Sequence, residues 1–207
     1  MRTMLIEGIG TFFLVLVVGL TVIAPGAGMM APLAIGAALM VMVYAGGHIS
    51  GAHYNPAVTL AVWLRGKCPA KDVPAYMGAQ LAGAVLAAVA AGWLTQGSAV
   101  APMEPAVLPA LLAELLFTFA LAFVVLNVAT AKKTAGNAYF GLAIGFTVTA
   151  GAYAAGPISG GVFNPAVAVG LTLLGLSAAG DLWIFLAANL AGGALAAVAF
   201  RAVNPRD

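Results

Sequence analysis

Charged residues are scarce in this chain. Of its 207 residues, 8 are Lys or Arg and 6 are Asp or Glu, and together they make up 7% of the sequence. A soluble domain carries about 25% charged residues, so this shortage excludes an ordinary soluble protein. The formal net charge of +2 gives no sign of a nucleic-acid partner.

Cysteine and histidine are almost as rare. The single cysteine, Cys68, allows no internal disulfide, and the two histidines, His48 and His53, belong to no cluster of metal ligands. The sequence also contains no nucleophile–base pair and no phosphate-binding loop. We therefore expect no metal, no cofactor and no enzymatic activity.

Long apolar stretches dominate the chain instead. Hydrophobic residues make up 63% of it, and six stretches are long enough, or nearly so, to cross a bilayer core about 30 Å thick. The first is expected to be a span and not a cleaved signal peptide, because Glu7 lies inside its apolar run. The six predicted spans are roughly 4–23, 31–48, 73–95, 108–130, 138–155 and 182–202.

All basic residues fall at one side of this six-span arrangement. They lie near the two termini and in the connections at 65–71 and 131–137. The connections on the other side, near 24–30, 96–107 and 156–181, contain none. By the positive-inside rule we expect a multi-pass protein of the cell (inner or plasma) membrane with both termini cytoplasmic.

The two halves of the chain repeat one another. Asn55-Pro56-Ala57 recurs in the second half as Asn164-Pro165-Ala166, and the pattern Glu-x-x-x-Thr-Phe begins at both Glu7 and Glu114. We call the spacing between Asn55 and Asn164 the repeat offset. Three spans per repeat is an odd number, so the second half must be inverted relative to the first. We expect a single transmembrane domain over 1–207, with inverted repeats at approximately 1–100 and 108–207.

Each Asn-Pro-Ala lies between a break and a short helix. The polar, glycine-rich segments 46–54 and 156–163 are expected to interrupt the helices before them, and the apolar runs that follow, 56–64 and 165–174, are too short to span. Asn is a preferred N-cap, and Pro is favoured at the first helical position. The pattern predicts two half-helices whose N-termini meet near the membrane midplane.

Such a junction suits an uncharged, hydrogen-bonding solute. Each half-helix N-terminus carries roughly half a positive charge, which repels cations, while Asn55 and Asn164 can offer side-chain N–H groups. The breaks leave backbone carbonyls free as acceptors on either side. The expected carbonyls are those of Gly51, Ala52 and His53 in the first break and of Gly160, Gly161 and Val162 in the second.

The residues around the first Asn-Pro-Ala carry a family resemblance. The pattern His-Ile-Ser-Gly-x-His-x-Asn-Pro-Ala-Val-Thr over 48–59, together with the second Asn-Pro-Ala, resembles the aquaporin family of major intrinsic proteins. The resemblance covers essentially the whole chain. It implies an all-α hourglass of six transmembrane helices and two re-entrant half-helices, a pore in each subunit, and a homotetramer.

The chain departs from this family at the outer constriction. Family members nearly always have Arg three residues after the second Asn, where this chain has Val167. By counting from the two Asn residues, the other positions of the constriction correspond to Ile35, Ala152 and Gly161. All four are apolar or small, so we expect a wide, uncharged outer filter; otherwise the narrowest point would lie at Phe163, His53 or Tyr153.

Four further polar residues have two readings each. Glu7 and Glu114 lie within spans, where a carboxylate is a functional candidate, but their matched placement favours accepting hydrogen bonds from the N–H groups of the re-entrant loops. His48 and His53 could relay protons, although structural hydrogen bonding in a crowded loop is favoured. We expect His48 to support its loop and His53 to line the pathway.

These features predict a passive channel for water or small uncharged solutes such as glycerol, urea, ammonia, peroxide or neutral metalloid acids. A coupled secondary transporter of a small solute is the alternative, since it too uses inverted repeats and broken helices. Coupling would need midplane ionisable residues, and Glu7 and Glu114 alone qualify. A non-conducting membrane protein with a purely structural role is the third possibility.

Overall fold

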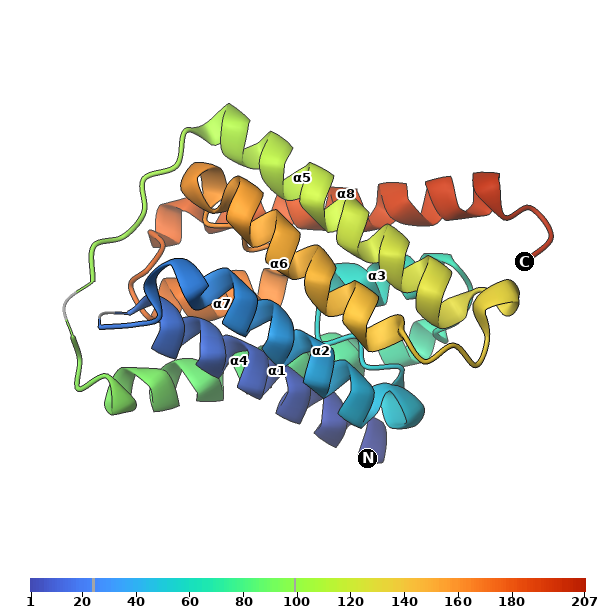
Figure 1. Ribbon diagram of the computed structural model, residues 1–207, viewed down its shortest axis with the longest axis horizontal. Helices are drawn as coiled ribbons and strands as arrows, with labels where there is room; N and C mark the ends of the chain where they lie inside the picture. Colours follow the sequence, from blue (N-terminus) through green and yellow to red (C-terminus); the bar gives the residue numbers. More distant parts are fainter. Residues whose placement is uncertain (24, 99) are drawn as a thin grey trace.

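The computed structural model describes residues 1–23, 25–98 and 100–207 (Figure 1). Six of the described helices are long and apolar enough to cross a membrane, and two shorter helices follow the Asn-Pro-Ala motifs. The six predicted spans and both half-helices are confirmed. The long helices are α1 (Arg2–Val22), α2 (Ala31–Ser50), α4 (Val73–Leu94), α5 (Val107–Val125), α6 (Phe140–Ser159) and α8 (Leu182–Val203), and the short ones are α3 (Pro56–Leu64) and α7 (Pro165–Leu173).

The helices pack with the symmetry of an inverted repeat. Helix α1 packs on α2 and α4 in the same way that α5 packs on α6 and α8, and α3 contacts α8 as α7 contacts α4. Figure 1 shows α3 and α7 among the long helices, toward opposite ends of the bundle. Both termini lie at the end that also holds the connection 131–139, as six crossings require. We refer to this end as the basic end.

Helices α2 and α6 touch backbone to backbone where the two repeats meet. A Cβ added to Gly36 would lie 2.6 Å from the carbonyl oxygen of Gly145, and a Cβ added to Gly145 would lie 2.5 Å from that of Gly36. Real Cβ atoms do not approach other atoms so closely, so both positions require glycine. Small residues commonly allow such close approach of helices in lipid, where apolar burial does not drive them together.

The breaks are shorter than the sequence indicated. Segments 46–54 and 156–163 were expected to be non-helical throughout, but α2 and α6 continue into both, even through Pro157. The helices end only where Gly51 and Gly160 adopt left-handed φ angles of +87° and +88°. An unsatisfied backbone group in a membrane costs several kcal/mol, so the helices persist up to these caps in spite of their glycines.

Candidate functional site

The loops between α2 and α3 and between α6 and α7 have an unusual backbone. Ala52, Tyr54 and Phe163 have φ angles of +52°, +50° and +51°, although none is glycine. A non-glycine residue in this left-handed region costs about 1–2 kcal/mol. The loops therefore need support from the surrounding helices.

Glu7 of α1 supplies that support to the first loop. One carboxylate oxygen accepts hydrogen bonds from Ser50 Oγ (2.6 Å) and the His53 backbone N–H (2.9 Å). The other accepts from the Tyr54 backbone N–H (2.7 Å) and from Gln80 Nε2 (2.8 Å). All four donors converge on one fully buried carboxylate, which fixes the loop to α1 and α4.

Glu114 of α5 does the same for the second loop. Its carboxylate accepts from Ser159 Oγ (2.7 Å) and from the backbone N–H groups of Val162 (2.9 Å) and Phe163 (2.7 Å). Asn189 occupies the position that matches Gln80, but its oxygen accepts from Thr118 Oγ1 (3.0 Å). Both glutamates thus accept hydrogen bonds from their re-entrant loops.

The two Asn-Pro-Ala motifs meet through reciprocal hydrogen bonds. Asn55 Nδ2 donates to the carbonyl oxygen of Phe163, and Asn164 Nδ2 donates to that of Tyr54, each at 2.9 Å. Each Asn oxygen also caps its own half-helix by accepting the N–H two residues onward, at 2.8 Å and 2.9 Å. An amide nitrogen has two hydrogens, so each Asn keeps one N–H for a further partner.

A cavity of about 340 Å³ contains this junction. Residues from both repeats line it, and among the described residues of its wall the polar side chains are those of His53, Asn55 and Asn164. None of these wall residues is Asp, Glu, Lys or Arg. The cavity is therefore an apolar space with a short polar strip at the point where the half-helices meet.

The four expected filter residues all line this cavity. Ile35, Ala152, Gly161 and Val167 all line it, although they come from α2, α6, the second loop and α7. Gly161 lies next to Ala152, where an added Cβ would be 3.1 Å from the Ala152 Cα. The side chains of the four residues offer neither a charge nor a hydrogen-bond donor.

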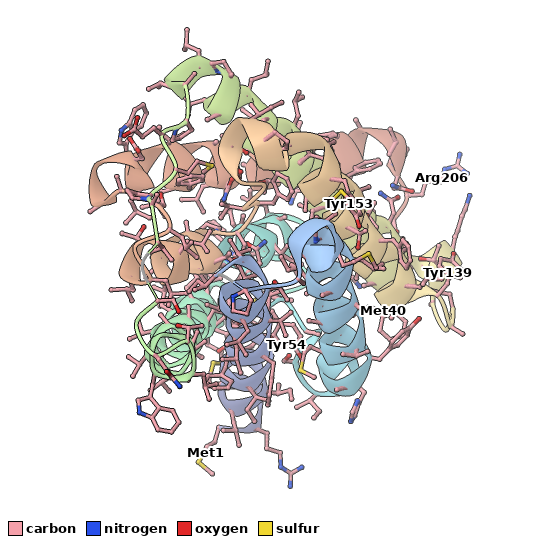
Figure 2. The ribbon with its side chains drawn as sticks, turned by 60° about the vertical axis from the view of Figure 1, so that its left-hand side comes forward. Met1, Met40, Tyr54, Tyr139, Tyr153 and Arg206 are labelled. Carbon is pink, nitrogen blue, oxygen red and sulfur yellow. The ribbon has the colours of Figure 1, made fainter. Side chains whose placement is uncertain are left out.

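Two residues considered as alternative constrictions lie elsewhere. The Phe163 ring is buried against the Phe117 ring, with 5.3 Å between centroids. Tyr153 is exposed, and its hydroxyl donates to the carbonyl oxygen of Met29 (3.0 Å). Figure 2 shows Tyr54 in the middle of the bundle and Tyr153 beside the start of α2.

Comparison with known proteins identifies the family of this chain. The family described as "Major intrinsic protein" matches residues 1–200. The chain belongs to this family. It is 42% identical over 175 residues to "Aquaporin NIP1-4" of Oryza sativa subsp. japonica, covering 82% of this chain and 63% of that relative. It is 39% identical over 216 residues to "Aquaporin NIP1-3" of the same organism, covering 97% and 73%.

A solved structure shows the same architecture. The X-ray structure of the aquaglyceroporin from Plasmodium falciparum superposes with a TM-score of 0.77 at 22% identity, covering 99% of this chain and 95% of that one. The aquaporin-like hourglass expected from the sequence is therefore confirmed. The chain spans 63% of the length of the first rice relative.

The residues whose carbonyls were expected along the pore of this major intrinsic protein line two cavities. Ala52, His53, Gly160, Gly161 and Val162 line the central cavity, while Gly51 lines a second one at the basic end. None of the described residues donates a hydrogen bond to the carbonyl oxygens of residues 51–53 or 160–162. These oxygens are available as acceptors.

The expectation that His48 supports its loop is wrong. His48 is exposed on α2, and no described residue forms a hydrogen bond with its ring. The support comes from α4 instead, where Tyr76 donates to the carbonyl oxygen of Ser50 (2.8 Å) and Gln80 donates to Glu7. The sequence contained one signal for this, because Gln80 and Asn189 are also related by the repeat offset.

Proposed function

We propose that this major intrinsic protein is a passive channel for water and small uncharged solutes. The observation that supports this most strongly is the central cavity, which passes between two opposed half-helix N-termini with an uncharged wall. The spare N–H groups of Asn55 and Asn164 and the free loop carbonyls provide a donor–acceptor sequence for a neutral solute. The Asn-Pro-Ala motifs form the middle of the pore.

The same geometry disfavours ions. Each half-helix N-terminus contributes roughly half a positive charge, and the reciprocal bonds join the two N-terminal Asn residues to the opposite loops. A cation there meets positive ends, and an anion must lose its hydration against an apolar wall. Exclusion of charge follows without any ionised side chain in the wall.

The outer filter consists of Ile35, Ala152, Gly161 and Val167. These side chains offer no charge and no donor, so a solute that passes them loses hydration water without a side-chain hydrogen bond in return. Solutes larger than water should therefore pass it. The physiological solute belongs to a group that includes glycerol, urea, ammonia, peroxide and neutral metalloid acids.

A coupled transporter receives less support. Coupling requires an ionisable group that can take up and release an ion, and Glu7 and Glu114 are the intramembrane carboxylates. Glu7 already accepts four hydrogen bonds and Glu114 three, all in fully buried positions. Both have a structural role that a change of protonation would disrupt. Solute flux should accordingly continue without any ion gradient.

The proposal includes assembly and orientation. Residues 1–207 form a single channel domain with inverted repeats at approximately 1–100 and 108–207, and the family resemblance supports a homotetramer with one pore per subunit. The basic end is assigned to the cytoplasm, so both termini are cytoplasmic in a cell (inner or plasma) membrane.

Stopped-flow swelling and shrinking of proteoliposomes tests this function. The wild type should conduct water and at least one of glycerol and urea above the level of protein-free vesicles, and ionophores should not change the rate. Val167→Arg should slow the larger solutes more than water, because it adds a charge and up to five donors to the outer filter. Val167→Met is the matched control, since it adds length without charge.

Wild-type flux at the level of protein-free vesicles for every solute would contradict the channel function. A dependence of solute flux on a proton or sodium gradient would instead support the transporter. Equal effects of Val167→Arg and Val167→Met would show that volume, and not charge, matters at this position.

A further inference from the structure

A second cavity of about 220 Å³ lies at the basic end, separate from the central one. Lys67, Ala129 and Thr130 are among the residues that line it. The two cavities have two residues in common, His53 and Val125. These two residues therefore lie where the two cavities adjoin, and we call this boundary the His53–Val125 neck.

The two residues of the neck come from different kinds of structural element, a loop and the end of a helix. His53 belongs to the first re-entrant loop, whereas Val125 is the last residue of α5. Beyond Val125 the helix changes to a π-helical turn, Leu126–Thr130, and Ala129 and Thr130 of this turn line the second cavity. Such turns are rare and occur frequently at functional sites. Here the turn begins directly after the neck.

The His53 ring is held rigidly on its side of the neck. Its Nδ1 lies 3.1 Å from Thr59 Oγ1, and its ring packs on Tyr76 with 4.8 Å between centroids. Its backbone N–H donates to Glu7. The buried ring has two contacts and its backbone a third, so a solute cannot displace the ring at little cost.

The contacts of Thr59 favour one tautomer of His53. The single Thr59 hydroxyl hydrogen is donated to the carbonyl oxygen of Asn55 (3.1 Å), and Gln80 Nε2 donates to the hydroxyl oxygen (2.9 Å). With the hydroxyl hydrogen on the Asn55 carbonyl, Thr59 accepts from His53, which puts the ring hydrogen on Nδ1 and a lone pair on Nε2. A Cβ added to Gly51 would lie 3.3 Å from Nε2, and Gly51 lines the second cavity. The lone pair therefore lies on the side of the ring next to that cavity.

We propose that the His53–Val125 neck, and not the outer filter, sets the size limit of this channel and selects its solutes. One side presents a fixed hydrogen-bond acceptor and the other an apolar isopropyl group. The neck passes small uncharged molecules that have an O–H or N–H to donate and that can shed water on their opposite face. This inference rests on the proposed channel function, and it assigns selectivity to the basic end of the pore.

Matched substitutions at the two ends of the pore test the neck. Val125→Ala and Ile35→Ala each replace a β-branched side chain by a methyl group, one at the neck and one at the outer filter. Val125→Ala should raise the ratio of glycerol to water permeability about tenfold, which is about 1.4 kcal/mol in the barrier. Ile35→Ala should leave this ratio within about twofold of the wild type. Size-exclusion chromatography checks that each variant is folded.

A second pair keeps the test valid if an alanine variant is unstable. Val125→Phe should reduce water permeability itself, whereas Ile35→Phe should reduce only that of the larger solutes. The neck proposal is overturned if Val125 variants leave the solute profile unchanged, or if Ile35 variants shift it more. Flux that appears only in Val125→Ala would support the neck while contradicting the channel function of the wild type. Background flux in every protein would contradict both.

Discussion

Replacing Glu7 by glutamine tests whether the carboxylates hold the re-entrant loops. The substitution keeps the shape of the side chain but turns one acceptor oxygen into an NH₂ donor. That NH₂ would face either Ser50 Oγ and the His53 N–H, or the Tyr54 N–H and Gln80 Nε2. The Ser50 hydroxyl can rotate and the Gln80 amide can flip, but a backbone N–H can do neither.

One buried backbone N–H is therefore left without an acceptor in either orientation. Losing a hydrogen bond to a charged group costs about 1.5–3 kcal/mol, and the bonds that remain weaken when the charge is removed. We predict that Glu7→Gln lowers the free energy of unfolding by about 3–5 kcal/mol. Glu114→Gln should cost less, because three donors converge on Glu114 and four on Glu7.

Unfolding in mixed detergent micelles with increasing dodecyl sulfate measures these changes. Glu104→Gln is the matched control, because Glu104 is exposed and the same chemical change there should alter stability by less than about 0.5 kcal/mol. If Glu7→Gln is as stable as Glu104→Gln, the loops are not held by this carboxylate. A stable Glu7→Gln that lost only gradient-dependent transport would support ion coupling instead.

Two further predictions concern charge and orientation. Asn164→Asp should raise cation conductance, since a carboxylate offsets the positive helix ends. The control, Asn164→Ser, keeps an N-cap oxygen without the charge and should exclude cations as the wild type does. Equal cation conductance of the two variants would refute the dipole argument. Lys133→Cys, made in a Cys68→Ser background, should be protected from an impermeant external thiol reagent in intact cells, and labelling there would place the basic end outside. Cys68 itself is buried, and burial, together with the Asp72 and Glu7 carboxylates, raises the pKa of its thiol.

The sequence predicted the elements that depend on local patterns. Apolar length located the six spans, and the repeat offset, together with the capping preference of Asn and Pro, located both half-helices. The inverted packing also followed, because an odd number of spans per repeat allows no other arrangement. The ends of the breaks did not follow, since residues 46–50 are glycine-rich but remain helical where the membrane penalises free backbone groups.

Features that depend on tertiary contacts were beyond the sequence. Nothing near Tyr76 or Thr59 indicates that Tyr76 packs on the His53 ring and that Thr59 contacts its Nδ1. The π-helical turn after Val125 has no sequence signature of its own. The four expected filter positions rest on fixed distances from the Asn residues, whereas the neck joins a loop to a helix end far away in the chain.

Departures from the internal symmetry indicate where selectivity arises. The repeat gives both loops the same left-handed backbone and the same glutamate support, so these features cannot distinguish the two ends of the pore. The repeat offset pairs His53 with Val162 and Thr59 with Ala168. The outer half therefore lacks both the imidazole and the hydroxyl that orients it. A solute entering from the outer side meets apolar side chains and the carbonyl oxygens of residues 160–162 as far as the Asn pair. Its first fixed side-chain acceptor beyond that pair is His53. Because binding groups are concentrated in the half nearer the basic end, a barrier that distinguishes one neutral solute from another belongs there as well.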